Sequence, residues 1–274
     1  MDTAIQALIM GIVQGLTEFL PISSSGHLIL VPAMLGWDDP FITSLAFSVM
    51  LHLGTLVALL VYFRRDWLRL VPAGLAALRD RSFRDDQDRR LAWILLATTI
   101  PAIIAGLLFN DVIETTVRQP GLVALMLLVG AAIMWIADRT RGSRDIPGVT
   151  FPIAVGIGAA QALALIPGIS RSGVSISAAR FAGLDRPAAA RFSFLMSAPI
   201  IAMAGAYETL KLVRAGAEGG VEVIPMIVGM VAALLSGLVA IHFLLRWLAG
   251  HSLDLFVAYR IVLAAVVLIW FLNP

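Results

Sequence analysis

The chain has 274 residues, of which 59% are hydrophobic and only 14% are charged, and its mean hydropathy is +0.92. A soluble domain carries about 25% charged residues, so this composition cannot supply a water-exposed surface and indicates an integral membrane protein. The absence of cysteine excludes disulfides, thiolate metal sites and cysteine nucleophiles. The net charge of +2 gives no reason to expect nucleic acid as a partner, because membrane topology explains the basic residues.

Apolar runs recur along the whole chain and leave no stretch long enough for a separate aqueous domain. We therefore expect one integral membrane domain over residues 1–274, with an all-α polytopic fold. Five runs approach the roughly 20 residues that cross a bilayer core, and a sixth is shorter. The six predicted transmembrane helices lie at 44–63, 92–109, 121–137, 192–210, 223–245 and 255–272.

The distribution of arginine predicts how these spans are oriented. The segment 64–90 carries eight arginines, which the positive-inside rule places in the cytoplasm. Alternation from there puts fifteen arginines inside, and only Arg118, Lys211 and Arg214 outside. Both chain ends are then predicted outside. Residues 1–20 lack the basic start of a signal peptide, so we expect the N-terminus to be retained.

Two further apolar segments, 4–36 and 152–180, are interrupted by proline, glycine and closely spaced serines, which break a helix. Irregular backbone at membrane depth is tolerated only where protein buries it or where it lines a wet cavity. We therefore predict two re-entrant helical hairpins. The first should enter and leave from the outside, and the second from the inside.

The two halves of the chain match each other. A shift of 147 residues places five small or polar residues of the first hairpin on their counterparts in the second, namely Gly11, Gln14, Ser23, Ser25 and Gly26 on Gly158, Gln161, Ser170, Ser172 and Gly173. This predicts an inverted-topology repeat, with residues 1–137 as the first unit, 138–151 as an inner linker and 152–274 as the second unit. Interrupted helices at matching positions of such repeats indicate a binding site at their interface, although short Gly and Ser matches also arise by chance.

The ionisable residues inside these interrupted segments are the main candidates for chemistry. Glu18 and Arg171 are costly at membrane depth and should face a cavity or each other. Gln14 lies four positions before Glu18 and shares its helix face. An arginine fork with serine hydroxyls and turn amides suits a phosphate group. His27 beside the serines has the composition of an activated nucleophile or general base, and one carboxylate with phosphate oxygens suits Mg²⁺ or Ca²⁺.

Purely structural roles are open for many of these residues. Glu18 and Arg171 could form a structural ion pair, and His27 could be a hydrogen-bonded core residue. Capping or packing could explain Ser23, Ser172, Ser175 and Ser177. His52 could bridge helices, Gln161 could join helices by hydrogen bonds, and Arg260 is expected to extend to the inner membrane surface. His242 and His251 are expected at that boundary.

The string QGLTEFLPISSSGHL at 14–28 and the string PGISRSGVSIS at 167–177 closely resemble the undecaprenyl-diphosphate phosphatase family, also called bacitracin-resistance proteins. The resemblance covers nearly the whole chain. It implies hydrolysis of undecaprenyl diphosphate to the monophosphate and inorganic phosphate in the bacterial cytoplasmic (inner) membrane, with an active site open to the outer, periplasmic side. This reaction would recycle the lipid carrier for peptidoglycan and other cell-wall synthesis and confer bacitracin resistance. The resemblance also allows a homodimer.

By resemblance, Ser24 and His27 correspond to the catalytic pair of the first turn, and Glu18 to the acidic motif. We expect Ser24 as the nucleophile and His27 as proton acceptor or donor, while Glu18 holds a divalent cation or orients a water and Arg171 clamps the phosphates. His27 or a water molecule as the nucleophile is compatible with the same residues. The predicted phosphate-binding residues are Gln14, Ser23, Ser25, Gly26, Gly168, Ser170, Ser172 and Gly173.

Some positions depart from common family patterns. Gln14 stands where some members carry Glu, and Ser48 stands where many carry an acidic residue, so Glu18 should carry more of the metal or acid–base role. Ser25 and Ser175 stand where Thr is often found, which keeps the hydroxyl. The main alternative is a lipid-carrier flippase or transporter, because inverted repeats with broken helices are also the architecture of alternating access. A passive anion channel is a third interpretation.

Overall fold

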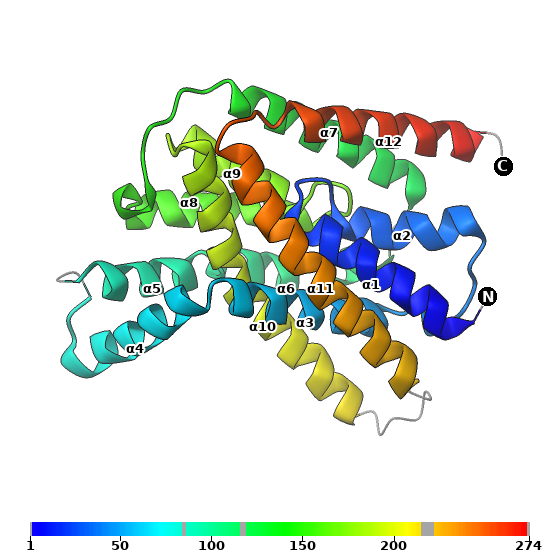
Figure 1. Ribbon diagram of the computed structural model, residues 1–274, viewed down its shortest axis with the longest axis horizontal. Helices are drawn as coiled ribbons and strands as arrows, with labels where there is room; N and C mark the ends of the chain where they lie inside the picture. Colours follow the sequence, from blue (N-terminus) through cyan, green and yellow to red (C-terminus); the bar gives the residue numbers. More distant parts are fainter. Residues whose placement is uncertain (1, 84–85, 116–118, 215–221, 273–274) are drawn as a thin grey trace.

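In the computed structural model, residues 2–83, 86–115, 119–214 and 222–272 are described, and they form helices with no β-strand among them. The α-helices are α1 (Thr3–Phe19), α2 (Ser24–Leu35), α3 (Leu45–Tyr62), α4 (Arg64–Asp80), α5 (Gln87–Ala97), α6 (Ile100–Thr115), α7 (Pro120–Asp138), α8 (Phe151–Ala162), α9 (Arg171–Phe181), α10 (Arg186–Arg214), α11 (Val223–Leu248) and α12 (Asp254–Leu272). Two short 3₁₀ helices are η1 (Ile146–Gly148) and η2 (Leu163–Leu165). The predicted all-α fold is confirmed for this part of the chain (Figure 1).

Six of the described helical segments are long and apolar enough to cross a membrane, as the sequence predicts. They are Leu45–Tyr62, Gln87–Phe109, Pro120–Asp138, Arg186–Tyr207, Val223–Leu248 and Asp254–Phe271. The second of these combines α5 with the first part of α6, and it begins five residues before the predicted start. Met1, Arg84, Arg118, residues 215–221 and residues 273–274 lie outside the described residues, and so do the side chains of Lys211 and Arg214.

The arginine-rich segment after α3 contains a helix that is not among the predicted spans. After Phe63, whose backbone is non-helical, the chain continues as α4. Alanine, leucine and arginine favour this helix, and it ends at Arg81, which takes the left-handed conformation. α4 packs antiparallel against α5 (Figure 1). The helix carries too many charged residues to resemble a transmembrane span, so its hydropathy does not indicate it.

Both interrupted segments are broken helices, as predicted. α1 ends at Phe19 where Pro21 follows, and α2 begins after Ser23. In the second segment, α8 tightens into η2, and Pro167 and Gly168 then separate it from α9. Each segment therefore consists of two helices joined by a short turn.

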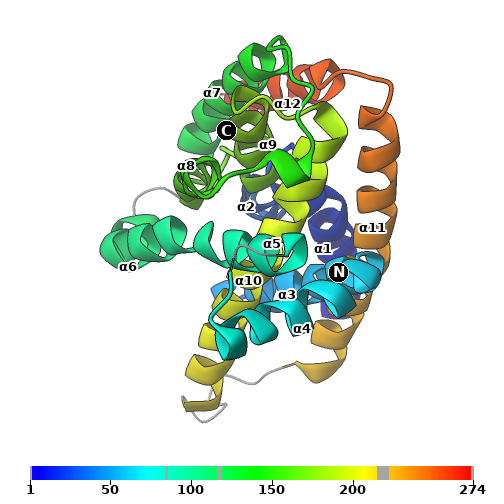
Figure 2. The same cartoon turned by 90° about the vertical axis from the view of Figure 1, so that its left-hand side faces the viewer.

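Close helix packing brings the first hairpin against the rest of the molecule. α1 packs along α11, and a Cβ placed on Gly11 would lie 2.2 Å from the carbonyl oxygen of Gly229. A Cβ on Gly15 would meet the Ser236 hydroxyl at 2.0 Å. Glycine is thus required for this approach of backbones, which is typical of helices packed in membranes. α7 and α12 also lie side by side, and both views show them (Figures 1 and 2).

Candidate active site

The turns that precede α2 and α9 have the same local geometry. Ser23 and Ser170 are both non-glycine residues with positive φ, 79° and 74°. Each caps the following helix by accepting a hydrogen bond from the backbone N–H three residues later, Gly26 at 3.3 Å and Gly173 at 3.1 Å. Their hydroxyls also lie 3.4 and 3.2 Å from those of Ser25 and Ser172. The 147-residue match thus extends to backbone conformation, while the inverted insertion in the bilayer stays a prediction.

The two turns contact each other directly. The Ser23 hydroxyl accepts a hydrogen bond from the Gly168 N–H at 3.1 Å, and the Ser172 hydroxyl donates to the Leu20 carbonyl at 3.1 Å. Gly168 has φ +101°, and a Cβ there would lie 2.5 Å from the Val123 carbonyl oxygen. The N-termini of α2 and α9 therefore lie next to each other. Both carry free N–H groups and partial positive charge, which favour an anion.

Glu18 at the end of α1 and Arg171 at the start of α9 form an ion pair beside these turns. The Arg171 Nη2 and the Glu18 Oε1 are 2.7 Å apart, and only 14% and 4% of the two side chains are exposed. Glu18 Oε2 accepts hydrogen bonds from the Ser24 hydroxyl at 2.6 Å and from the Gln14 amide at 3.1 Å. An acid from the first hairpin, an arginine from the second and a serine thus meet at one place, as the repeat predicts.

His52 also reaches this site, from α3. Its Nε2 lies 3.5 Å from Glu18 Oε2, and its Nδ1 is 2.7 Å from the Ser48 carbonyl oxygen, which fixes the ring. The Ser48 side chain supplies no carboxylate here. An isolated histidine on an apolar helix is compatible with a role in the site and with a purely structural bridge between helices. The sequence alone therefore does not identify His52 as a site residue.

His27 is held by partners other than Ser24. Its Nδ1 lies 2.8 Å from the Ser23 carbonyl oxygen, and its Nε2 lies 2.7 Å from the Tyr259 hydroxyl on α12. A carbonyl only accepts, so Nδ1 carries the proton and the Nε2 of a neutral ring accepts from Tyr259. The expected contact between His27 and Ser24 is absent among these bonds. Ser24 donates to Glu18 instead, so the carboxylate is the group placed to take its proton.

The expectation for Arg260 is wrong. This residue does not extend to the membrane surface: it is fully buried, with 0% exposed. Its guanidinium donates to the carbonyls of both turns, to Pro21 at 3.3 Å, Gly168 at 2.6 Å and Ile169 at 3.1 Å. It also donates to two α7 carbonyls, Met126 and Leu127. Arg260 lies about one turn inside the span, which suggested that its side chain reaches the membrane surface. Instead, backbone carbonyls at the two helix breaks accept its hydrogen bonds and take the place of water around the buried guanidinium.

Gln161 does not take the role of joining helices by hydrogen bonds, which the sequence left open. Its side chain is buried, and neither amide atom has a hydrogen-bond partner among the described residues. Ser175 and Ser177 take the structural role that the sequence left open, because their hydroxyls donate to the carbonyls of Arg171 and Gly173, both at 2.7 Å. These two serines thus add side-chain hydrogen bonds to backbone carbonyls in the first turns of α9.

The donor set at Glu18 bears on the predicted Mg²⁺ or Ca²⁺. The described residues contain no group of three or more His, Asp or Glu side chains placed to hold a metal. The Gln14 Oε1, however, is buried without a partner, on the side-chain amide whose Nε2 donates to Glu18. Amide and carboxylate oxygens with serine hydroxyls are the hard ligands that Mg²⁺ and Ca²⁺ prefer, so these residues fit such an ion if phosphate oxygens complete its shell.

The fold and this site define a class of protein: a multi-pass α-helical membrane protein in which two broken helices bring together a buried acid, an arginine and serines. The family described as bacitracin resistance protein BacA matches residues 7–266, so the chain belongs to this family. It is similar over nearly its whole length to proteins named undecaprenyl-diphosphatase. The one from Rubrobacter xylanophilus is 48% identical over 96% of both chains, and the one from Gemmatimonas aurantiaca is 47% identical over 97% of both. That from Desulforudis audaxviator is 44% identical over 96% of both.

Proposed function

We propose that this membrane protein hydrolyses undecaprenyl diphosphate to undecaprenyl monophosphate and inorganic phosphate. The observation that carries the proposal is the convergence of Glu18, Ser24 and Arg171 beside two helix N-termini. Relatives at 44–48% identity are named for this activity. Removal of the terminal phosphate would return the lipid carrier to cell-wall synthesis, which agrees with the family's description as bacitracin resistance proteins.

Positive charge at the two helix N-termini and at Arg171 positions the terminal phosphate. The N-termini of α2 and α9 offer backbone N–H groups to its oxygens, and Arg171 offers the guanidinium donors that Glu18 does not use. Phosphoryl transfer depends chiefly on positioning and on stabilising negative charge, so this arrangement supplies what the reaction needs. The prenyl chain would remain among the apolar helices.

The Ser24 hydroxyl is the proposed nucleophile. As its oxygen bonds to the terminal phosphorus, the bond between that phosphorus and the bridging oxygen breaks, and undecaprenyl monophosphate leaves. The Ser24 proton passes to Glu18 Oε2, which already accepts its hydrogen bond at 2.6 Å. A water molecule then cleaves the phosphoserine, releasing inorganic phosphate and restoring the hydroxyl. Glu18 gives the Ser24 proton to the departing monophosphate, so its carboxylate can then accept a proton from that water and return it to the Ser24 oxygen.

His27 and Tyr259 are proposed to orient the first turn rather than to attack phosphorus. His27 stacks on the Tyr259 ring, with centroids 5.8 Å apart and planes 15° apart, and both ring nitrogens are engaged. The Ser23 carbonyl holds the imidazole in its Nδ1–H form, and Tyr259 donates to the Nε2 of that form and so fixes the ring against α12.

Replacing Tyr259 by Phe is expected to lower kcat about fivefold and to leave KM nearly unchanged, since about 1 kcal/mol of hydrogen bonding is lost while the phosphate ligands stay. ¹⁵N NMR of labelled histidine should show the His27 Nε2 signal shifted in this variant, because that nitrogen loses the hydrogen bond from Tyr259. A wild-type kcat together with an unchanged histidine spectrum would contradict the role of Tyr259.

Arg260 is proposed as a positioning residue for both turns. It links Pro21 of the first turn to Gly168 and Ile169 of the second. The carbonyl of Ile169 and the N–H of Ser170 belong to one trans peptide unit, so the N–H points away from the guanidinium. A positive charge behind the carbonyl polarises this unit and makes its N–H a stronger donor at the start of α9.

We propose Mg²⁺ or Ca²⁺ as the accompanying ion, held by Glu18 and the Gln14 Oε1 together with substrate oxygens. The ion would supply additional neutralisation of the diphosphate charge. Every proton transfer assigned above is made by residues of the chain itself.

The protein's place in the cell follows from its topology. We propose that it lies in the bacterial cytoplasmic membrane with both chain ends and the active site on the outer side, because arginine is concentrated in the opposite loops. A homodimer is a further proposal that rests on the family resemblance alone.

Purified protein in detergent tests the proposed function. Inorganic phosphate should be released from undecaprenyl diphosphate by the wild type and not by a Ser24→Ala variant. Liposomes loaded with the same lipid provide the second arm: a flippase or transporter would move lipid or anion without releasing phosphate, and that result would overturn the proposal. The names of the relatives favour hydrolysis over transport.

A further inference from the structure

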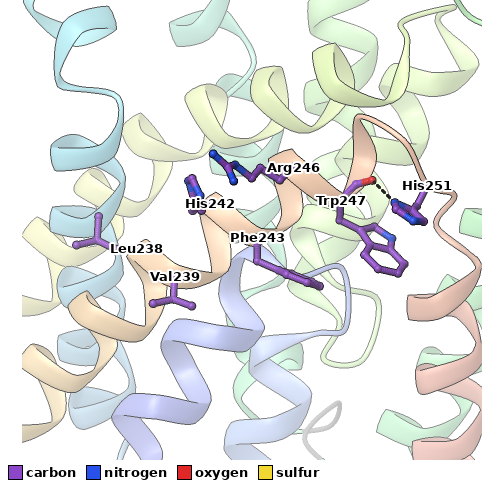
Figure 3. A pocket seen from close by; sticks show the side chains of 7 residues that line it. All are labelled: Leu238, Val239, His242, Phe243, Arg246, Trp247 and His251. Atoms are coloured by element: carbon purple, nitrogen blue, oxygen red, sulfur yellow. Dashed lines mark hydrogen bonds between the residues drawn. The ribbon is translucent and has the colours of Figure 1, made fainter.

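A groove of about 620 Å³ lies on the surface of α11 near the end of that span, and it shares no lining residue with the candidate active site (Figure 3). Its lining side chains come from about three turns of α11 and from the connection to α12. They are Leu238, Val239, His242, Phe243, Arg246, Trp247 and His251. Nothing in the proposed hydrolysis uses these residues.

The groove is amphiphilic along its length. Leu238 and Val239 form its apolar end, which lies towards the middle of the span, and Arg246 and His242 form its polar end near the boundary. Val239 and Arg246 are seven residues apart, which corresponds to about 10 Å along a helix. This order, a cation at the boundary and an apolar track running inward, matches a lipid with a charged headgroup.

Arg246 is exposed and has no carboxylate partner. It makes neither an ion pair nor a side-chain hydrogen bond within the part of the chain that the structure describes. Figure 3 shows its guanidinium directed along the helix towards His242. His242 Nδ1 lies 3.2 Å from the Tyr62 hydroxyl, so when it accepts from Tyr62 its Nε2 carries a proton and can donate to an anion. Two donors one helical turn apart thus have no acceptor in the described protein.

Another arginine at the end of a span provides a contrast. Arg139, after α7, lies 3.8 Å over the Trp135 ring and forms an ion pair with Asp254 at 3.4 Å. Like Arg246, it has a tryptophan nearby in sequence at the end of a span, but a carboxylate already neutralises it. Charge complementarity therefore points to an anion at Arg246 and gives no reason for one at Arg139.

The aromatic wall of the groove is fixed by its own contacts. The Trp247 ring stacks on His251 at 4.1 Å and on Phe243 at 5.8 Å, and its Nε1 donates to the Ser252 carbonyl at 3.1 Å. Tryptophan is enriched where a membrane meets water, at the depth of lipid headgroups. A preformed wall at this depth lowers the entropy lost when a flexible lipid binds.

We propose that this groove binds an anionic glycerophospholipid of the surrounding bilayer. Its phosphate accepts hydrogen bonds from Arg246 and His242, its glycerol region lies against Trp247, and one acyl chain lies along Leu238 and Val239. The bilayer itself supplies this lipid at high local concentration. The proposal is independent of the hydrolytic reaction.

Native mass spectrometry of the purified full-length chain tests the site, with phosphatidylglycerol and phosphatidylcholine of identical acyl chains as probes. The wild type should bind phosphatidylglycerol about tenfold more tightly, because both probes offer a phosphate but only phosphatidylcholine places a quaternary ammonium charge beside Arg246. Arg246→Gln should abolish this preference, and the matched control Arg139→Gln should keep it. A thermal melt of each variant shows whether it is folded.

Three results would overturn the proposal. Arg246→Gln could retain the preference, Arg139→Gln could lose it equally, or undecaprenyl monophosphate could displace phosphatidylglycerol at equal concentration, which would make the groove a site for the prenyl lipid. Phosphate release is measured on the same preparations. A loss of release in the wild type would count against the proposed function and would leave the lipid site standing.

Discussion

A Glu18→Gln variant is expected to release inorganic phosphate from undecaprenyl diphosphate about 10³-fold more slowly than the wild type. The amide cannot take the Ser24 proton, and general base catalysis is worth about 10²–10⁴-fold. It also removes the negative charge that holds Arg171 at 2.7 Å. The measurement is kcat in detergent micelles at saturating substrate, with the folded fraction determined from a thermal melt.

Asp254→Asn is the control for this experiment, because Asp254 is an exposed acid paired with Arg139 outside the site. It should keep the wild-type rate. If Glu18→Gln retained more than a tenth of the wild-type kcat, the assignment of Glu18 as the proton acceptor would be wrong.

An Arg260→Met variant is expected to lose about 3–5 kcal/mol of unfolding free energy and most of its activity per folded molecule. The substitution leaves the carbonyls of Pro21, Gly168 and Ile169 buried without their donor, and breaking a buried charged network has this cost. The two turns also lose their common partner, so the site should loosen. Denaturant unfolding in micelles measures the first effect, and phosphate release corrected for the folded fraction measures the second.

Arg180 offers a matched control, since it is also a buried arginine that donates to backbone carbonyls, those of Leu184 and Thr140. Arg180→Met should lose stability in the same way but keep wild-type activity per folded molecule. Equal loss of specific activity in both variants would show that Arg260 acts through general stability and has no positioning role.

The spans could be predicted because hydropathy and length depend on local sequence alone. All six predicted spans appear, with boundaries shifted by at most six residues. The breaks before α2 and α9 were equally predictable, because proline and glycine act on the backbone in every context. α4 was not assigned because its arginines lower the hydropathy, although its alanines and leucines favour a helix.

The site was predictable where charge made a residue conspicuous. Glu18 and Arg171 are costly in a membrane, and the repeat placed them together. Tyr259 and Arg260 could not be predicted as site residues, because they lie on α12, far from the two turns in sequence. Their partners are also only backbone carbonyls and one histidine ring. No sequence pattern encodes contacts to carbonyls. Two adjacent polar residues inside an otherwise apolar span were the available signal.

The partners of Ser24 and His27 show why their residue types alone do not define which group is the base for the serine. Serine and histidine three residues apart suggest a nucleophile and its base, but one helical turn can direct the two side chains to different neighbours. Here Ser24 turns towards Glu18 on α1, and His27 towards Tyr259 on α12. The positive φ of Ser23 sets this geometry, and sequence reasoning does not identify a left-handed serine.

A double-mutant cycle on kcat/KM for phosphate release tests most directly whether Glu18 and Arg171 act together on one phosphate. The conservative variants Glu18→Asp and Arg171→Lys keep both charges and should each lower kcat/KM measurably. If the two side chains form one unit, the double variant should be at least about tenfold more active than the product of the single effects predicts. Effects that simply multiply would show two independent residues and would contradict a shared site.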